Sequence, residues 1–477
     1  MKKQKPLFIQ RRKRKATSFH HALITVTAVI LCVYFGIIHW RSEPQIPLVL
    51  ACLCAGLMAF FLGYSWDEIL QGMIDGIIDS LEAILILLVI GMLVGSWIAS
   101  GTVPTMICYG LKIVTAGTFL PAAMITCLLI SFAIGSWGTV GTIGLAFMGM
   151  GLSLGLSAPV VAGAVISGAY LGEVISPLSD ATNLAAAVAG EDVFLIVRKA
   201  IVPALTAGCI CVVLYAFTGL LLGKGEAQIV GSEIEPILNS LYSRFQITPA
   251  TLIPLVLIIG FILMKIPAIP AMLFSALIGM IEAVFLQHMS METVLSSAWS
   301  GYTGVSGNKM IDALLSAGGM KGMLDAVSVI LFAMAFGGIM KKTGQMNALV
   351  RPLLESIHSN GILKAITVLT CVVMNTILPD QYLAISMPGQ MYSDAYDQRG
   401  ITRADLGTVL LGGGAVTSPL VPWNTCGIYC MTILSVSPLS YIRYAYLGLL
   451  LPFTVICMGF LPSQKKTADQ IMLKEKQ

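Results

Sequence analysis

The sequence predicts an all-α polytopic membrane protein built from two inverted repeats of about five transmembrane helices, each with a re-entrant hairpin and a broken helix. Composition is the first reason: of 477 residues, 57% are hydrophobic and 11% are charged, and the mean hydropathy is +0.87. Soluble domains carry about a quarter charged residues. The second reason is the order of the apolar segments. The same order of spans and interrupted stretches occurs in the first half of the chain and again in the second half.

The first predicted repeat covers 22–222 and follows a basic tail, 1–21. Apolar stretches long enough to span a bilayer cover roughly 22–40, 45–64, 82–99, 158–190 and 197–222. Pro177 interrupts one of these spans and predicts a broken helix. The glycine-rich stretch at about 120–156 is too interrupted for an ordinary span, so we expect a re-entrant hairpin with its tip at GSWGTVGTIG, from Gly135.

A polar linker, 223–248, leads to the second predicted repeat, 249–461, and to a C-terminal tail, 462–477. Its apolar stretches cover roughly 249–264, 267–287, 324–340, an interrupted 365–392, 404–435 and 444–461. Two anchors support the repeat: Gly101 and Gly344 are 243 residues apart, and the prolines of two Ser-Pro-Leu motifs, Pro177 and Pro419, are 242 apart. An odd number of spans in each repeat inverts the second repeat in the membrane.

The distribution of charge predicts the orientation. Most of the 28 lysines and arginines fall on the side of the N-terminal tail, and basic residues mark the cytoplasmic side of membrane proteins. Both tails are therefore predicted to be cytoplasmic and the linker 223–248 extracytoplasmic. The segment WDEILQGMIDGIIDS, 66–80, predicts an amphipathic cytoplasmic helix.

Several function classes are disfavoured. The eleven cysteines lie mostly in apolar runs, and the five histidines lie at segment ends. No HExxH, CxxC or Walker lysine motif occurs. We therefore expect neither an enzyme nor a resident cofactor, and no nucleic-acid partner; the lipid bilayer is the expected environment.

The first broken helix carries the most informative segment, GAYLGEVISPLSDATNLAAAVAG, 168–190. Five polar residues lie close to its break: Ser176, Ser179, Asp180, Thr182 and Asn183. Carboxylate, hydroxyl and unwound carbonyl oxygens suit sodium, and the low dielectric makes an empty, charged Asp180 costly. Either Na⁺ or H⁺ relieves that cost, so we predict Na⁺ at Asp180 in competition with H⁺. The alternative is that Asp180 only caps the helix that restarts after Pro177.

The second break, AVTSPLVPWNTCG from Ala415, offers neutral ligands, with Pro422 at the position of Asp180. Its candidates are Ser418, Asn424 and Thr425. Two more acids fall within spans, and we rank them after Asp180: first Asp380, then Glu173. A position at the water interface is the alternative for both. Ser136 and Thr139 are candidate ligands too, although small and hydroxyl residues also let membrane helices pack closely, and packing is the favoured interpretation.

The motifs GEVISPLSDATNLAAAVAG and TSPLVPWNTCGIY resemble those of the NhaC-type sodium/proton antiporter family. The resemblance covers nearly the whole chain. It implies two inverted repeats and exchange of Na⁺, with Li⁺ as a further candidate, for H⁺ by alternating access at a bacterial plasma membrane.

The same family includes relatives that exchange malate and protons for sodium and lactate, and others that resemble amino-acid carriers. A small organic anion therefore stays open as a further substrate. The sequence also leaves open the ion stoichiometry, the pH dependence, a homodimer, and which of Glu173 and Asp380 joins Asp180.

Overall fold

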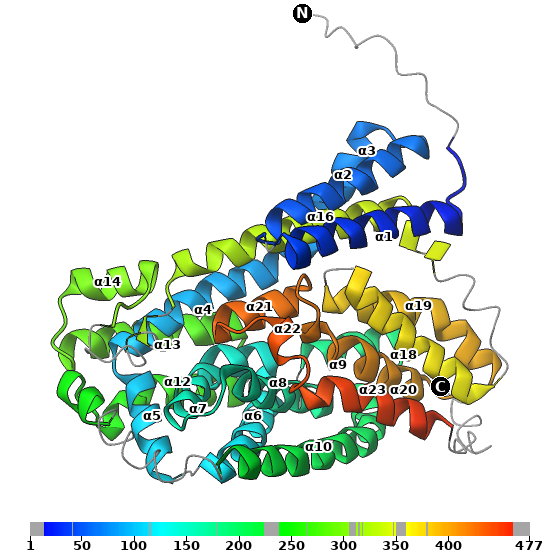
Figure 1. Ribbon diagram of the computed structural model, residues 1–477. Helices are drawn as coiled ribbons and strands as arrows, with labels where there is room; N and C mark the ends of the chain where they lie inside the picture. The colour runs from blue at the N-terminus through cyan, green and yellow to red at the C-terminus, as the bar shows by residue number, and fades with distance from the viewer. Residues whose placement is uncertain are drawn as a thin grey trace, which may run out of the picture. The chain divides into compact units, whose positions relative to one another are not determined.

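The computed structural model describes residues 14–40, 42–113, 116–177, 179–223, 238–264, 266–304, 312, 315–316, 318–346, 348–349, 359–377 and 380–460. Within these ranges helix is the only regular secondary structure (Figure 1), so the predicted all-α fold is confirmed. The predicted tail 462–477, and parts of the tail 1–21 and the linker 223–248, lie outside the described residues.

The chain forms two compact units. The first unit contains residues 1–82, 328–357 and 377–379, and the second contains 83–327, 358–376 and 380–477. Helices of the first unit are α1 (Phe19–Val33), continued by the π-helical segment η1 (Tyr34–His39), α2 (Gln45–Phe61), α3 (Trp66–Asp79) and most of α16 (Leu324–Lys342).

Glycines bring α3 and α16 of the first unit into backbone contact. A Cβ added at Gly338 would lie 2.0 Å from the carbonyl oxygen of Gly72, and one at Gly76 would lie 2.2 Å from the carbonyl oxygen of Met334. Small residues spaced by four along a helix allow this close approach in membrane proteins. The amphipathic helix predicted at 66–80 is therefore present, and it packs through its glycines.

The first half of the second unit contains eight helical segments. They are α4 (Leu81–Ala99, whose first two residues belong to the first unit), α5 (Thr102–Ile113), α6 (Ala116–Thr139), η2 (Val140–Gly144), α7 (Leu145–Ser153), α8 (Ala158–Ile175), α9 (Asp180–Ala189) and α10 (Val193–Gly223). Helices α6 and α8 pack side by side more extensively than any other pair of described elements (Figure 1). Gly168 and Gly172 permit this contact, since an added Cβ would lie 2.2 and 2.4 Å from carbonyl oxygens of α6.

The remaining segments follow in chain order. They are η3 (Pro249–Leu252), α12 (Ile253–Leu263), α13 (Ala268–Phe285), α14 (Met291–Ser300), η4 (Met320–Met323), α18 (Asn360–Ile377), α19 (Gln381–Gln398), α20 (Arg403–Leu410), η5 (Leu411–Ala415), η6 (Ser418–Leu420), α21 (Thr425–Leu434), α22 (Pro438–Tyr441) and α23 (Tyr446–Gly459). The predicted spans match the long helices, whereas the short helices α5 and α14 were not predicted.

Length and composition show a multi-pass membrane protein. Among the described residues, 5 helices are long and apolar enough to cross a bilayer, or up to 8 if each bent pair is one span. Shorter apolar helices at Gln45–Phe61, Gly117–Phe132, Ile269–Phe285 and Tyr446–Gly459 add to these. The predicted number of spans in each repeat stays a prediction.

All four predicted breaks are present. Gly135, with φ 73°, interrupts α6, and the chain breaks again between α18 and α19. The span at 158–190 divides into α8 and α9 around Pro177. In the second half, Arg403–Leu420 and Thr425–Leu434 meet at a bend of 46°. Whether the two hairpins re-enter the membrane stays a prediction.

The starts and ends of helices around these breaks recur at a constant spacing. Gly135 and Asp380, which precede the helices after the hairpin breaks, are 245 residues apart. So are the N-cap residues Ser179 and Asn424, which begin helices of 10 residues each. Those helices end at left-handed residues with φ 65° and 55°, Gly190 and Ser435, again 245 apart. The recurrence supports the repeat, while its inverted orientation stays a prediction.

The spacing of 245 residues corrects one correspondence between the two halves that was predicted from the sequence. Thr425, and not Pro422, stands at the position of Asp180, because each is the first residue of its helix. In the first half the N-cap Ser179 directly follows the Ser-Pro-Leu motif. Three further residues, Val421 to Trp423, separate that motif from the N-cap in the second half.

Candidate functional site

Side chains around the first break satisfy the backbone groups that the break frees. The Ser179 hydroxyl accepts from the amide of Thr182 at 3.4 Å, and the Asn183 amide donates to the carbonyl oxygens of Pro177 and Ser179 at 3.0 and 2.8 Å. The Thr182 hydroxyl donates to the carbonyl oxygen of Glu173 at 3.0 Å, across the break. The carbonyl oxygens of Glu173, Pro177 and Ser179 therefore have internal hydrogen-bond partners.

Ser176 is the C-cap residue of α8. Its hydroxyl donates to the carbonyl oxygen of Phe132 in α6 at 2.5 Å. This bond fixes the end of the helix that carries Glu173 against the end of the helix that leads to the Gly135 break. Ser176 thus positions the two segments.

Asp180 is the first residue of α9 and its side chain is exposed. Ser179 is the N-cap, so Asp180 does not cap the helix in the way that we weighed as the alternative. A carboxylate in the first turn interacts favourably with the positive end of the helix dipole. The structure thus places the Asp180 carboxylate in an exposed position at the start of α9.

Asp380 is buried and serves as the N-cap of α19. One carboxylate oxygen accepts from the amides of Tyr382 and Leu383 at 2.8 and 3.0 Å, and the other accepts from the Thr425 hydroxyl at 3.4 Å. Glu173 is buried as well. Thr425 joins the start of α21 to the break before α19.

The second break is held by a network of amides. Asn424 accepts from the amide of Cys426 at 3.1 Å and donates to the side-chain oxygen of Asn375 at 3.1 Å. The Asn375 amide donates in turn to the Thr417 hydroxyl at 2.9 Å. The Ser418 hydroxyl donates to the side-chain oxygen of Gln381 at 3.1 Å. These contacts tie the second broken helix to both sides of the break between α18 and α19.

The two hairpin breaks converge on Glu173. Ser136 and Gln381, the first residues after the two breaks, both lie beside its carboxyl group. Asp180, Glu173 and Asp380 all lie within electrostatic reach of the Tyr382 hydroxyl. The structure therefore brings the three acids into one region of the second unit, whereas the Thr139 hydroxyl donates to the carbonyl oxygen of Gly135 in its own helix at 2.8 Å.

Sequence reasoning missed two residues of this region. Tyr170 lies one turn before Glu173 on α8 and within electrostatic reach of it. Cys426 donates from its thiol to the side-chain oxygen of Gln381 at 2.8 Å. A tyrosine three residues before an acid inside an apolar helix is a signal that the sequence contains.

Within the described ranges, no three His, Cys, Asp or Glu side chains come close enough to hold one metal ion together. The three acids therefore do not form a single carboxylate cage. A sodium site in this region would combine one carboxylate with hydroxyl or amide oxygens, which are also ligands that hard cations accept.

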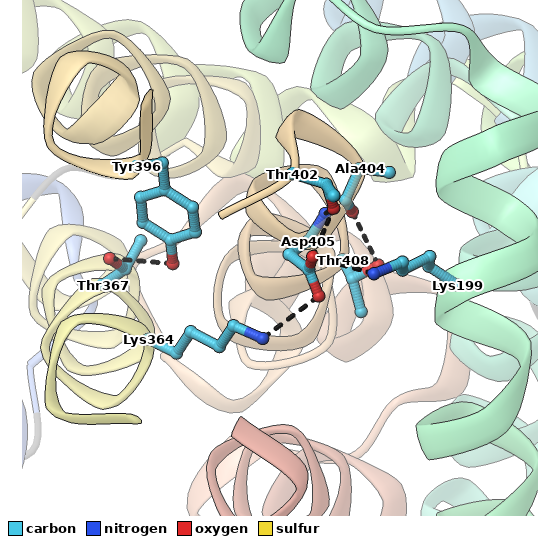
Figure 2. A network of polar contacts seen from close by, with 8 residues as sticks. All are labelled: Lys199, Lys364, Thr367, Tyr396, Thr402, Ala404, Asp405 and Thr408. Atoms are coloured by element: carbon cyan, nitrogen blue, oxygen red, sulfur yellow. Dashed lines mark hydrogen bonds and ion pairs between the residues drawn. The ribbon is translucent and has the colours of Figure 1, made fainter. Parts of the chain in front are cut away.

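A separate ion network fixes the start of the second broken helix (Figure 2). The Asp405 carboxylate, on α20, pairs with Lys199 of α10 at 2.8 Å and with Lys364 of α18 at 3.1 Å. The Thr402 hydroxyl also donates to this carboxylate. Three helices are thereby joined at the N-terminal end of α20.

An all-α membrane protein whose helix breaks gather buried acids, hydroxyls and amides has the architecture of an ion-coupled secondary transporter. The chain belongs to the Na⁺/H⁺ antiporter family, whose model matches residues 16–220 and 168–462.

Relatives of different specificity align over most of the chain. The Na⁺/H⁺ antiporter NhaC of Alkalihalophilus pseudofirmus is 31% identical over 94% of this chain and 96% of that protein. The malate-2H⁺/Na⁺-lactate antiporter of Bacillus subtilis is 35% identical over 92% of this chain and 94% of that protein. The arginine/ornithine antiporter ArcD of Halobacterium salinarum is 32% identical over 94% of this chain and 92% of that protein.

Proposed function

We propose that this protein exchanges Na⁺, with Li⁺ as a further cation, for H⁺ across the bacterial plasma membrane by alternating access. One observation carries the proposal: in a chain of the Na⁺/H⁺ antiporter family, the first residues after two helix breaks meet at the buried carboxyl group of Glu173. The exchange uses the ion gradients and needs no cofactor.

Competition between the two ions follows from the cost of a buried charge. A carboxylate inside the membrane is expensive when it is charged and empty, and either Na⁺ or H⁺ neutralises it. The neutral site, loaded with either ion, switches its access from one side of the membrane to the other. The empty, charged site makes this switch slowly. Asp180, exposed at the start of α9, is proposed to receive the cation in this cycle.

The orientation is proposed with both termini in the cytoplasm, because most of the 28 basic residues fall on that side of the predicted spans.

Exchange of a small organic acid is the second candidate. The malate-2H⁺/Na⁺-lactate antiporter, which aligns over 92% of this chain, supports it. Amides at helix N-termini, such as the start of α19, bind anions in many proteins. At α19, however, Asp380 already accepts from those amides, which favours inorganic ions.

The test is sodium-evoked proton movement in liposomes that contain the purified protein and an internal pH dye. We expect a dye response to a sodium pulse without any organic acid, and a much smaller response for Asp180→Asn. Asp192→Asn is the matched control, because Asp192 is an exposed acid before the next helix, where asparagine caps equally well.

A response that appears only with malate or lactate would replace the proposal by the organic-acid exchanger. A normal response from Asp180→Asn would remove Asp180 from the cycle. A wild-type protein without any response under either condition would refute both functions.

A further inference from the structure

Three buried oxygen atoms of the second unit have no hydrogen-bond partner among the residues that the structure describes. They are the hydroxyl oxygens of Ser136 and Tyr170 and the Oε2 atom of Glu173. The exposed fractions of these residues are 1%, 1% and 6%. Ser136 lies beside the Glu173 carboxyl, and Tyr170 lies within its electrostatic reach. We call these three residues the Glu173 cluster.

Unpartnered groups of this kind are costly. A buried hydroxyl without a partner loses the hydrogen bonds that water would supply, and a charged carboxylate loses more. Among the described residues of the second unit, the other buried side-chain oxygens without a partner belong to Glu282 alone. Among these residues, only those of the Glu173 cluster bring unpartnered oxygens of two helices within electrostatic reach of one carboxyl group, which indicates that a small ligand completes their interactions.

The chemistry of the cluster suits a hard cation. A carboxylate and two hydroxyl oxygens are ligands that Na⁺ accepts, and the carboxylate supplies the charge that neutralises it. The side-chain oxygen of Gln381 already accepts from Ser418 and Cys426, which holds this amide next to the cluster. The cluster thus combines one charged and two neutral oxygens in a buried place.

The other two acids are less suited to hold the ion. Asp380 already accepts three hydrogen bonds, so a cation would have to compete with these donors. Asp180 is exposed, so its carboxylate is less enclosed by the protein than that of Glu173. Glu173 combines burial with an open coordination position.

We propose that Glu173, Ser136 and Tyr170 form the sodium-binding site, and that Asp180 receives the ion before it reaches them. This inference rests on the proposed exchange of Na⁺ for H⁺ and assigns its central carboxyl group. The three ligands come from the first half, on α8 and after the Gly135 break, while Gln381 from the second half lies at the edge of the site.

Sodium-dependent stabilisation of the detergent-purified full chain tests the site directly. A ligand that binds the folded state raises the apparent melting midpoint. We expect the wild type to show a higher midpoint in NaCl than in choline chloride at equal ionic strength. Glu173→Gln should lose this difference, whereas the control Asp192→Asn should keep it. A full sodium shift in Glu173→Gln would overturn the assignment.

Two further variants keep the Glu173 carboxyl group, so they test the site even if Glu173→Gln misfolds. Ser136→Ala and Tyr170→Phe each remove one hydroxyl and should raise the sodium concentration for half-maximal stabilisation about tenfold, which corresponds to ~1.4 kcal/mol. Half-maximal concentrations equal to the wild-type value in both variants would overturn the site, even if Glu173→Gln failed to fold.

The inference and the proposed function fail in different ways. A wild type with sodium-evoked proton movement, combined with normal sodium binding by Glu173→Gln, refutes the Glu173 cluster and leaves the exchange intact. A wild type that binds no sodium and moves no protons refutes both.

Discussion

Removal of Asp405 should destabilise the protein more than most single substitutions, because it leaves a buried lysine without its partner (Figure 2). In Asp405→Ala, the Lys364 side chain, 8% exposed, loses its carboxylate. Breaking a buried ion pair by removal of one partner costs about 3–5 kcal/mol. Lys199, 35% exposed, is solvated more easily and adds less to this cost. We therefore expect a loss of ~3–5 kcal/mol, with Lys364 as its main source.

A second substitution isolates the cause. Asp405→Ala combined with Lys364→Met removes the orphan charge and keeps an apolar chain of similar length, so it should recover part of the loss. Asp75→Ala is the matched control, because Asp75 pairs with Lys342 at 3.3 Å on the exposed surface of the first unit. Exposed pairs contribute little because water and salt screen their charges, so this variant should stay close to the wild type.

The assay is the half-life of monodisperse protein at a fixed elevated temperature in detergent, since unfolding of a large membrane protein is commonly irreversible. We expect the longest half-lives for the wild type and Asp75→Ala, an intermediate half-life for the double variant, and the shortest for Asp405→Ala. Equal half-lives for Asp405→Ala and Asp75→Ala would refute the reasoning. So would a double variant that decays faster than Asp405→Ala.

Two further predictions use the same assay. Gly338→Ala should shorten the half-life, because the new Cβ would lie 2.0 Å from the carbonyl oxygen of Gly72 and overpacking costs about 1–3 kcal/mol. Gly260→Ala, where a Cβ meets nothing within 4 Å, should be neutral or stabilising, and equal losses in both would contradict the contact. Trp423→Phe removes the hydrogen bond to the carbonyl oxygen of Thr376 at 2.6 Å and should cost about 0.5–1.5 kcal/mol. The exposed Trp66→Phe is its control, and indistinguishable half-lives of the two tryptophan variants would count against that bond.

Local sequence signals determined the helices and their breaks. Apolar runs of spanning length predicted the helices because the bilayer demands internally satisfied backbone groups over a set thickness. Pro177 and Gly135 marked breaks because proline lacks the amide proton and glycine tolerates a positive φ. The acids Asp180, Asp380 and Glu173 stood out because charges are rare in apolar spans.

Only the tertiary structure separated the three acids. The Asp380 carboxylate accepts hydrogen bonds from amides of its own helix and from Thr425, while Asp180 is exposed at the start of a helix. Glu173 is buried among hydroxyls that have no partner, one of which, Tyr170, had not been predicted. The sequence ranked Glu173 last because burial and the lack of a partner depend on contacts between α6, α8 and α19, segments far apart in the chain, which no local pattern encodes.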